Sequence, residues 1–144
     1  MRVLTDHIAG SSKALRKCRR SDVKANGQVS KSVFMPRAEG QDRDGLSVSI
    51  QSNGFNDLHR QRFAVDGRQA CSITVSVVRE LNPLDVVPDP MEDDPTHSLI
   101  VGIPDRSLSV ENLAAAEQFA RQLAKRASPF TFPEETAAPT SAIV

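Results

Sequence analysis

The sequence predicts an α+β domain, in which a small, mainly antiparallel sheet carries a C-terminal helix across one face. Residues 71–78 alternate apolar residues with Ser and Thr, as in a strand with one buried face. Residues 110–127 repeat apolar residues every three or four positions, as on one side of a helix. The chain has 144 residues, 39% of them hydrophobic and none of them Trp or Tyr, which is enough for one aliphatic core.

The N-terminal part is predicted to be a basic segment, residues 1–30, that precedes a core domain of residues 31–128. A short strand is expected near residues 3–4. Ser12 is a candidate cap for a short basic helix that ends at Arg20. The apolar stripe of that helix would comprise Ala14, Leu15 and Cys18.

Short apolar runs predict the strands of the sheet. They lie near Val33 and over residues 46–50, 71–78 and 98–101, with a further short strand at 84–87. Residues 53–68 suit a short helix or an irregular loop equally well.

The C-terminal helix has clear boundary signals. Ser109 is a plausible N-cap, and Glu111 suits the positive end of the helix dipole. Beyond the helix the composition shifts to Pro, Thr, Ala and Glu, so residues 129–144 are expected to form a flexible tail.

The charges balance overall but are segregated along the chain. The formal net charge is zero, so no global field attracts nucleic acid or a membrane. Two opposite blocks are either solvated faces that pair with each other or surfaces that recognise a partner. The basic block comprises Lys13, Arg16, Lys17, Arg19, Arg20 and Lys24. The acidic block comprises Asp89, Glu92, Asp93 and Asp94.

The two cysteines, Cys18 and Cys71, predict neither a disulfide framework nor a zinc site, because neither has a Cys or His neighbour at ligand spacing. No metal or cofactor is expected. No apolar run approaches the roughly 20 residues that span a bilayer, and the N-terminus lacks the apolar core of a signal peptide. We therefore expect a cytoplasmic protein with no membrane partner.

His97 is a candidate site residue because it stands where an acidic, proline-containing loop enters a strand. If Leu99 and Val101 face the core, His97 shares their face. Its structural interpretation is a hydrogen bond to loop carbonyls or carboxylates. Its functional interpretation is a polar group whose pKa is raised by Asp93 and Asp94.

Arg37 and Ser47 form a second candidate set. Arg37 follows an apolar run and a proline, and Ser47 alternates with apolar residues in the strand at 46–50. Such a serine ordinarily marks the polar face of a strand. The sequence has no Gly-x-Ser-x-Gly elbow, no phosphate-binding loop and no dinucleotide fingerprint.

Three stretches of the chain carry a resemblance to a known family. They are SVFMPR at 32–37, GLSV at 45–48 and PTHSLIVG at 95–102. With them, residues 32–126 resemble a family of small bacterial domains of unknown function, which implies an ordered domain and a bacterial source. An arginine followed by a serine on a strand also resembles ADP-ribosyltransferase-like folds. The glutamate that completes such sites has no clear counterpart, and Glu80 is the nearest.

Three functions follow as hypotheses. The first is a non-enzymatic bacterial accessory protein that acts in a complex with another protein, and a flat sheet burying the candidate residues would favour it. The second is an ADP-ribosyltransferase-like, NAD-using enzyme, favoured by a cleft that joins Arg37, Ser47 and His97. The third is a nucleic-acid-binding accessory protein, favoured by a continuous basic face from Lys13 to Arg68. Arg60 and Arg62 would extend that face.

Overall fold

The structure, a computed structural model, describes residues 8–37, 44–65 and 67–132 and contains a six-stranded antiparallel sheet of order β4-β5-β2-β1-β3-β6. The strands are β1 (Lys13–Arg19), β2 (Leu46–Ile50), β3 (Arg68–Thr74), β4 (Asp85–Pro88), β5 (His97–Val101) and β6 (Ser128–Phe130). The α-helices are α1 (Asn56–Phe63), α2 (Val75–Arg79) and α3 (Val110–Arg126). Short 3-10 helices are η2 (Arg20–Asp22), η3 (Lys31–Phe34) and η4 (Asn53–Phe55). The predicted α+β class is confirmed.

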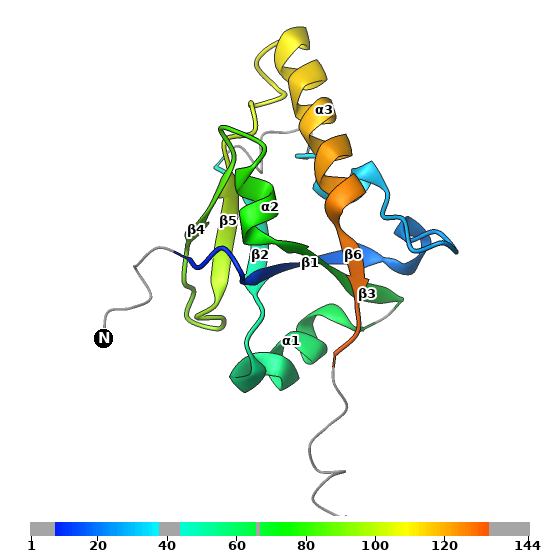
Figure 1. Ribbon diagram of the computed structural model, residues 1–144, viewed down its shortest axis with the longest axis vertical. Helices are drawn as coiled ribbons and strands as arrows, with labels where there is room; N and C mark the ends of the chain where they lie inside the picture. The colour runs from blue at the N-terminus through cyan, green and yellow to red at the C-terminus, as the bar shows by residue number, and fades with distance from the viewer. Residues whose placement is uncertain (1–7, 38–43, 66, 133–144) are drawn as a thin grey trace, which may run out of the picture.

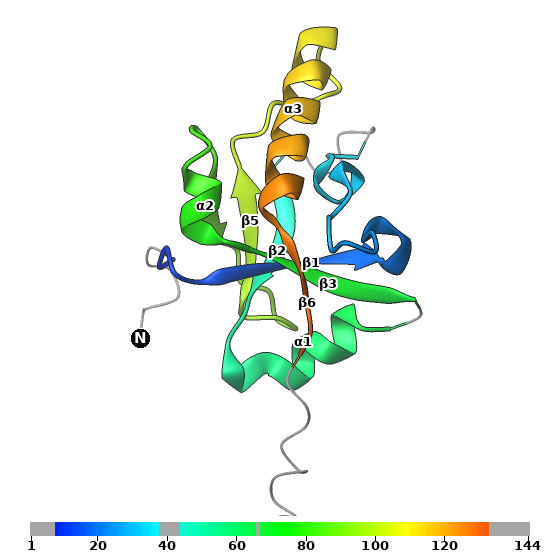
Figure 2. The ribbon, with the colours of Figure 1, turned by 45° about the vertical axis from the view of Figure 1, so that its right-hand side comes forward.

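The two sides of the central strands are covered unequally. Helices α2 and α3 lie on one side of β1 and β3, and α1 lies on the other (Figures 1 and 2). The main core fills the α3 side, where buried residues of the strands meet those of α3. They include Ala14, Cys18, Leu46, Val48, Cys71, Ile73, Ile100, Ala120, Leu123 and Ala124. Only a small cluster, Leu15, Phe63 and Ala70, lies between the sheet and α1.

Helix α3 forms where the sequence predicts it. Ser109 caps its N-terminus, since the Ser109 hydroxyl accepts a hydrogen bond from the Asn112 amide at 3.0 Å. The buried stripe contains three alanines, which let the helix approach closely. None of the described helices is long and apolar enough to cross a membrane.

Residues 13–19 form the strand β1 and not the predicted basic helix. β1 pairs with β3 along its whole length, from Lys13 opposite Thr74 to Arg19 opposite Arg68. The positions of Ala14 and Cys18 fit the alternation of a strand as well as a helical stripe, so the cross-strand pairing decides. The segment predicted to precede the core therefore supplies one of its central strands. The strand predicted near residues 3–4 lies outside the described residues.

The strand predicted at 71–78 ends at Thr74, where α2 begins. Val75 and Val78 are both fully buried. Their spacing of three residues places both side chains on the same side of a helix. The Val75 amide donates to the Ser12 carbonyl at 2.9 Å, at the point where β3 ends and α2 begins. Tertiary contacts thus override the strand preference of a valine-rich run.

Two further boundaries differ from the prediction. The apolar run at Val33 is the 3-10 helix η3, which Ser30 caps by accepting from the Ser32 amide, and it packs against α3. The segment predicted as a flexible tail begins within the strand β6, which pairs with β3 and places Phe130 opposite Ala70. Residues 133–144 of the predicted tail lie outside the described residues. The region 53–68 contains the helix α1, and the strands predicted at 46–50, 84–87 and 98–101 correspond to β2, β4 and β5.

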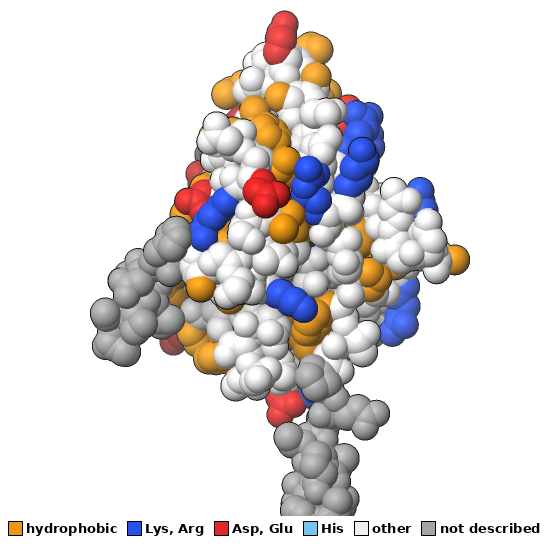
Figure 3. Space-filling view, viewed as in Figure 1, with side chains coloured by type: hydrophobic (Ala, Val, Ile, Leu, Met, Phe, Trp, Pro, Cys, Tyr) orange, Lys and Arg blue, Asp and Glu red, His pale blue; other side chains and the backbone are white. Residues whose placement is uncertain are grey.

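The basic block does not form one surface. Lys24 lies near α3, where Lys31, Arg121 and Lys125 line the same shallow pocket. On the face seen in Figure 3, Lys and Arg side chains stand in separate groups, with polar and hydrophobic atoms between them. Lys13, Lys17 and Arg19 project from the same face of β1 as Leu15, since the side chains of a strand alternate.

Candidate functional site

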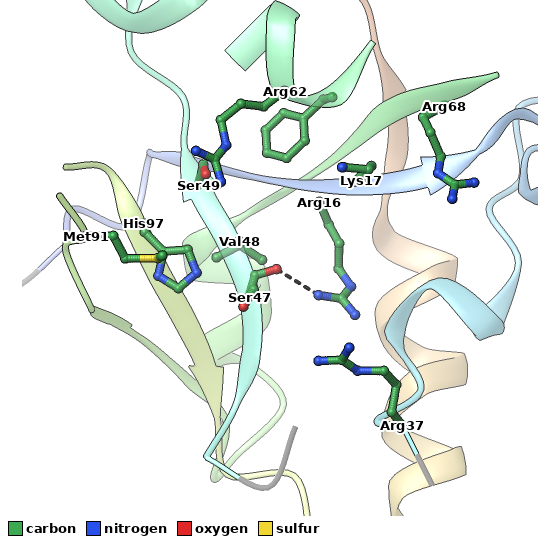
Figure 4. A pocket seen from close by; sticks show the side chains of 11 residues that line it. Arg16, Lys17, Arg37, Ser47, Val48, Ser49, Arg62, Arg68, Met91 and His97 are labelled. Carbon is green, nitrogen blue, oxygen red and sulfur yellow. Dashed lines mark hydrogen bonds between the residues drawn. The ribbon is translucent and has the colours of Figure 1, made fainter. Parts of the chain in front are cut away.

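A pocket of about 690 Å³ lies where β1 and β2 diverge (Figure 4). Its cationic lining side chains are Arg16, Lys17, Arg37, Arg62 and Arg68. Its other lining residues are Ser47, Val48, Ser49, Phe63, Met91 and His97. No acidic side chain is among the described residues that line it, although the chain as a whole carries no net charge. We call this pocket the basic pocket.

Arg16 bridges β1 and β2 at the point where the two strands separate. β1 and β2 pair only at Ala14 opposite Ile50 and Leu15 opposite Ser49. Just beyond, the Arg16 Nη1 donates to the Ser47 carbonyl at 2.7 Å, and its Nε donates to the Val33 carbonyl at 2.5 Å. The guanidinium thereby satisfies a carbonyl that a continued ladder would have paired. Arg16 is thus a structural residue that also brings charge to the pocket.

His97 forms the kind of hydrogen bond that its structural interpretation predicts, to a carbonyl of the acidic loop. Its Nδ1 lies 2.9 Å from the Asp89 carbonyl oxygen and 3.2 Å from Asp89 Oδ2. Since a carbonyl oxygen only accepts, Nδ1 carries the proton, and Nε2 is the ring nitrogen left for the pocket. Asp93 and Asp94, which the functional interpretation placed beside His97, instead pair with Arg62 and with Ser49 and Thr96.

The face of His97 also differs from the expectation. Ser98 and Ile100 are the buried residues of β5, and Ile100 belongs to the main core. Leu99 and Val101 therefore face away from that core, and His97 shares their side with Ser47 and Ser49 of β2. This alternation brings His97 into the same pocket as Ser47.

The acidic block separates into a buried residue and surface residues. Asp94 is fully buried, so it is not available to a partner at the surface. Asp93 pairs with Arg62 at the rim of the basic pocket, with Oδ2 3.2 Å from Nη1. Asp89 holds His97, and Glu92 is exposed.

Asp94 organises a buried polar network that the sequence did not suggest. Its Oδ2 accepts from the Ser49 hydroxyl at 2.6 Å, and its Oδ1 accepts from the Thr96 hydroxyl at 2.6 Å and the Thr96 amide at 3.0 Å. The His59 Nε2 lies 2.9 Å from the Thr96 hydroxyl oxygen. Because the Thr96 proton points to Asp94, His59 Nε2 must be the donor. The network joins α1, β2 and the turn before β5.

The network fixes the protonation states of its two titratable groups. Burial raises the pKa of Asp94, but hydrogen bonds from Ser49 and Thr96 outweigh it, so the pKa is lowered overall. Burial lowers the pKa of His59. Its Nδ1 is buried without a hydrogen-bond partner, so a proton added there would find no acceptor. With His59 neutral and Asp94 ionised, the network has a structural role, because it holds α1, β2 and the turn before β5 together. We do not assign it the role of activating a nucleophile.

Stability should therefore fall with acid in two stages. Below about pH 6.5, the unfolded chain binds a proton at His59 that the folded chain excludes, so the free energy of unfolding decreases as the pH falls. The depressed pKa of Asp94 adds a second loss as the pH falls through its folded value, below the ordinary 3.8. Urea unfolding across the pH range measures both stages. In the variant His59→Gln the amide can still donate to Thr96, but the loss of stability below about pH 6.5 should be absent. If the variant showed the same pH profile as the wild type, the assignment of that stage to His59 would be wrong.

The two cysteines meet in the core. Cys18 of β1 faces Gln69 in the register, which places it diagonal to Cys71 of β3. Both thiols are free and buried. The hydrogen bond between them lowers the pKa of Cys18 and, together with burial, raises that of Cys71. Neither residue lines the basic pocket.

The fold thus joins Arg37, Ser47 and His97 with two members of the basic block, Arg16 and Lys17. It adds Arg62 and Arg68, which the sequence offered only as a possible extension. Sequence reasoning missed the aromatic pair Phe130 and Phe132, which lies beside these cations. Its signal was the alternating Phe-Thr-Phe at residues 130–132, which was assigned to the tail. No protein-family model, curated protein or solved structure matches the chain, so no family is assigned to it.

Proposed function

We propose that this protein is a nucleic-acid-binding accessory protein that holds phosphate groups in the basic pocket. The observation that carries the proposal is the gathering of five cationic side chains around one pocket, with no acidic side chain among the described residues that line it. Lysine and arginine contacts to phosphates supply most of the affinity of non-specific nucleic-acid binding. Arginine also matches phosphate geometry through two parallel hydrogen bonds.

The cations differ in how freely they can meet a ligand. Among the described residues, Lys17 and Arg68 make no ion pair, and Lys17 is exposed. Arg62 is held by Asp93 in a partly exposed pair, which contributes little energy and can exchange for a phosphate. The Ser47 hydroxyl offers an uncharged donor beside them, and the His97 Nε2 offers an acceptor because the ring proton is on Nδ1. We therefore expect Lys17 and Arg68 to provide the strongest contacts.

The transferase hypothesis is the second candidate, because one pocket is lined by Arg37, Ser47 and His97 together. It lacks support for the carboxylate that such sites use. Glu80 caps the C-terminus of α2 and is not among the lining residues of the pocket. Saturable NAD binding that is lost in both Arg37→Ala and His97→Ala would favour this enzyme.

The proposal is tested by salt dependence. A fluorescein-labelled oligothymidylate of about 12 nucleotides should bind with a slope of log affinity against log salt of roughly −3, as four or five single-strand phosphate contacts require. Fluorescence anisotropy at salt concentrations from about 50 to 200 mM measures this slope.

Two outcomes would contradict the proposal. The first is absence of binding at the lowest salt. The second is tighter binding of polyglutamate of equal charge, which would favour the acidic segment of a protein partner and hence the hypothesis of an interaction protein.

A further inference from the structure

A second pocket, of about 430 Å³, adjoins the basic pocket and shares Arg68 with it. It lies between the end of α1 and the edge formed by β3 and β6. Its cations are Arg20, Arg60 and Arg68, and its aromatic residues are Phe130 and Phe132. Gln69, Ala64, Ala70 and Thr131 complete the lining. Among the residues that the structure describes, no acidic one lines it. We call this pocket the aromatic pocket.

The two phenylalanines are held firmly. Their ring centroids are 5.0 Å apart and their planes are inclined at 79°, a T-shaped contact that leaves ring faces uncovered by the partner ring. Both rings are half-buried against the small cluster under α1. The pairing of Phe130 with Ala70 fixes its backbone in the sheet. The Lys13 Nζ lies 6.0 Å from the centroid of the Phe130 ring, which adds another cation.

From this juxtaposition we propose that the aromatic pocket is a nucleobase subsite, and that the protein binds single-stranded nucleic acid in preference to duplex. The inference rests on the proposed function. Proteins that bind single strands combine a cationic path for the phosphates with aromatic side chains on which bases stack. Here the cationic path runs from the basic pocket to the aromatic pocket through Arg68. The bases of a duplex are stacked on each other, so their faces cannot reach Phe130 or Phe132.

The arginines of the aromatic pocket fit this role. Arg60 Nη1 donates to Asp57 Oδ1 at 2.6 Å, but the Asp57 side chain is 72% exposed, so solvent screens the pair. A phosphate can compete with Asp57 for this guanidinium.

The first measurement compares oligothymidylate with an abasic strand of the same length and charge. Wild-type protein should bind oligothymidylate about 10-fold more tightly, since stacking contributes a factor of this order for each base. The double variant Phe130→Leu/Phe132→Leu should lose the difference and keep its affinity for the abasic strand. Phe55→Leu, at a half-buried phenylalanine that lines neither pocket, is the matched control and should keep the difference. Thermal melts of all variants confirm that they fold.

The second measurement detects stacking directly. The chain contains no Trp or Tyr, so Phe132→Trp introduces a single indole whose fluorescence can be followed without a contribution from other Trp or Tyr side chains. Its fluorescence should be quenched by oligothymidylate and not by the abasic strand. Trp at position 55 in a Phe55→Trp variant should respond to neither.

The outcomes separate the two proposals. Equal wild-type affinity for oligothymidylate and the abasic strand, or equal affinity for single strand and duplex, would overturn the nucleobase subsite and leave the phosphate proposal standing. Failure to bind either strand would overturn the proposed function and this inference with it. Quenching of the indole at position 132 together with the 10-fold preference would establish the subsite.

Discussion

Replacing Asp94 by alanine should lower the free energy of unfolding by about 4 kcal/mol. The carboxylate accepts three hydrogen bonds, from the Ser49 hydroxyl, the Thr96 hydroxyl and the Thr96 amide. Each buried donor left without a partner costs roughly 1–3 kcal/mol. The loss also removes the charge that faces His59 at 3.9 Å. Domains of this size are stable by only about 5–15 kcal/mol, so the variant should be close to its limit of folding at 37 °C.

The neighbouring Asp93 provides the matched control. Its carboxylate is 66% exposed and makes only the rim pair with Arg62. Asp93→Ala should therefore change stability by less than about 1 kcal/mol. Urea unfolding followed by circular dichroism at neutral pH compares the two variants. Equal losses would show that the buried network does not hold the α1 side of the sheet together.

The sequence was most informative where one pattern excluded the others. The helix α3 has a cap at Ser109 and a stripe of three buried alanines from Ala116 to Ala124, so neither its type nor its place was in doubt. β2 is short, but its apolar residues alternate, and β5 contains the apolar run Leu99-Ile100-Val101 just before Gly102. These elements follow from local spacing alone, which is why the α+β class could be predicted.

The wrong predictions of secondary structure concern segments whose apolar residues fit both the spacing of a helix and that of a strand. The positions of Ala14 and Cys18 suit a helix or a strand, and the pairing of β1 with β3 decides between them. Val75 lies at a strand spacing from Ile73 and at a helix spacing from Val78. Local propensity cannot resolve such runs, because the choice depends on partners that are distant in the sequence.

The candidate site was predictable in its members but not in its arrangement. Arg37 and Ser47 were singled out as one set and His97 by itself, and one cleft for all three was only a condition of the transferase hypothesis. The fold brings them to one pocket. Asp94 was expected at the surface, but a hydrogen-bond network draws it inside. The charge blocks were misleading as units, since side chains of one strand alternate between opposite faces. Arg62 and Arg68 come from α1 and β3, so only the tertiary fold shows that they face Lys17.

Charge reversal at Lys17 and Arg68 should reduce the affinity for oligothymidylate by about 100-fold near 0.1 M salt. Each phosphate contact contributes roughly a factor of ten at this salt concentration, because its formation releases condensed counterions. Lys17→Glu/Arg68→Glu removes two contacts, so the slope of log affinity against log salt should become less negative by about 1.4. Both side chains lie outside the main core, so the fold should persist in a thermal melt.

The matched control reverses two lysines on the α3 side. Lys24→Glu/Lys125→Glu makes the same change in net charge, in a pocket that lies apart from the basic pocket. If long-range attraction alone drove binding, the two double variants would lose the same affinity and the same slope. If phosphates are held in the basic pocket, the control should stay within about 3-fold of wild type, as a screened distant charge requires. A control that loses as much as Lys17→Glu/Arg68→Glu would therefore remove the basic pocket as the binding site.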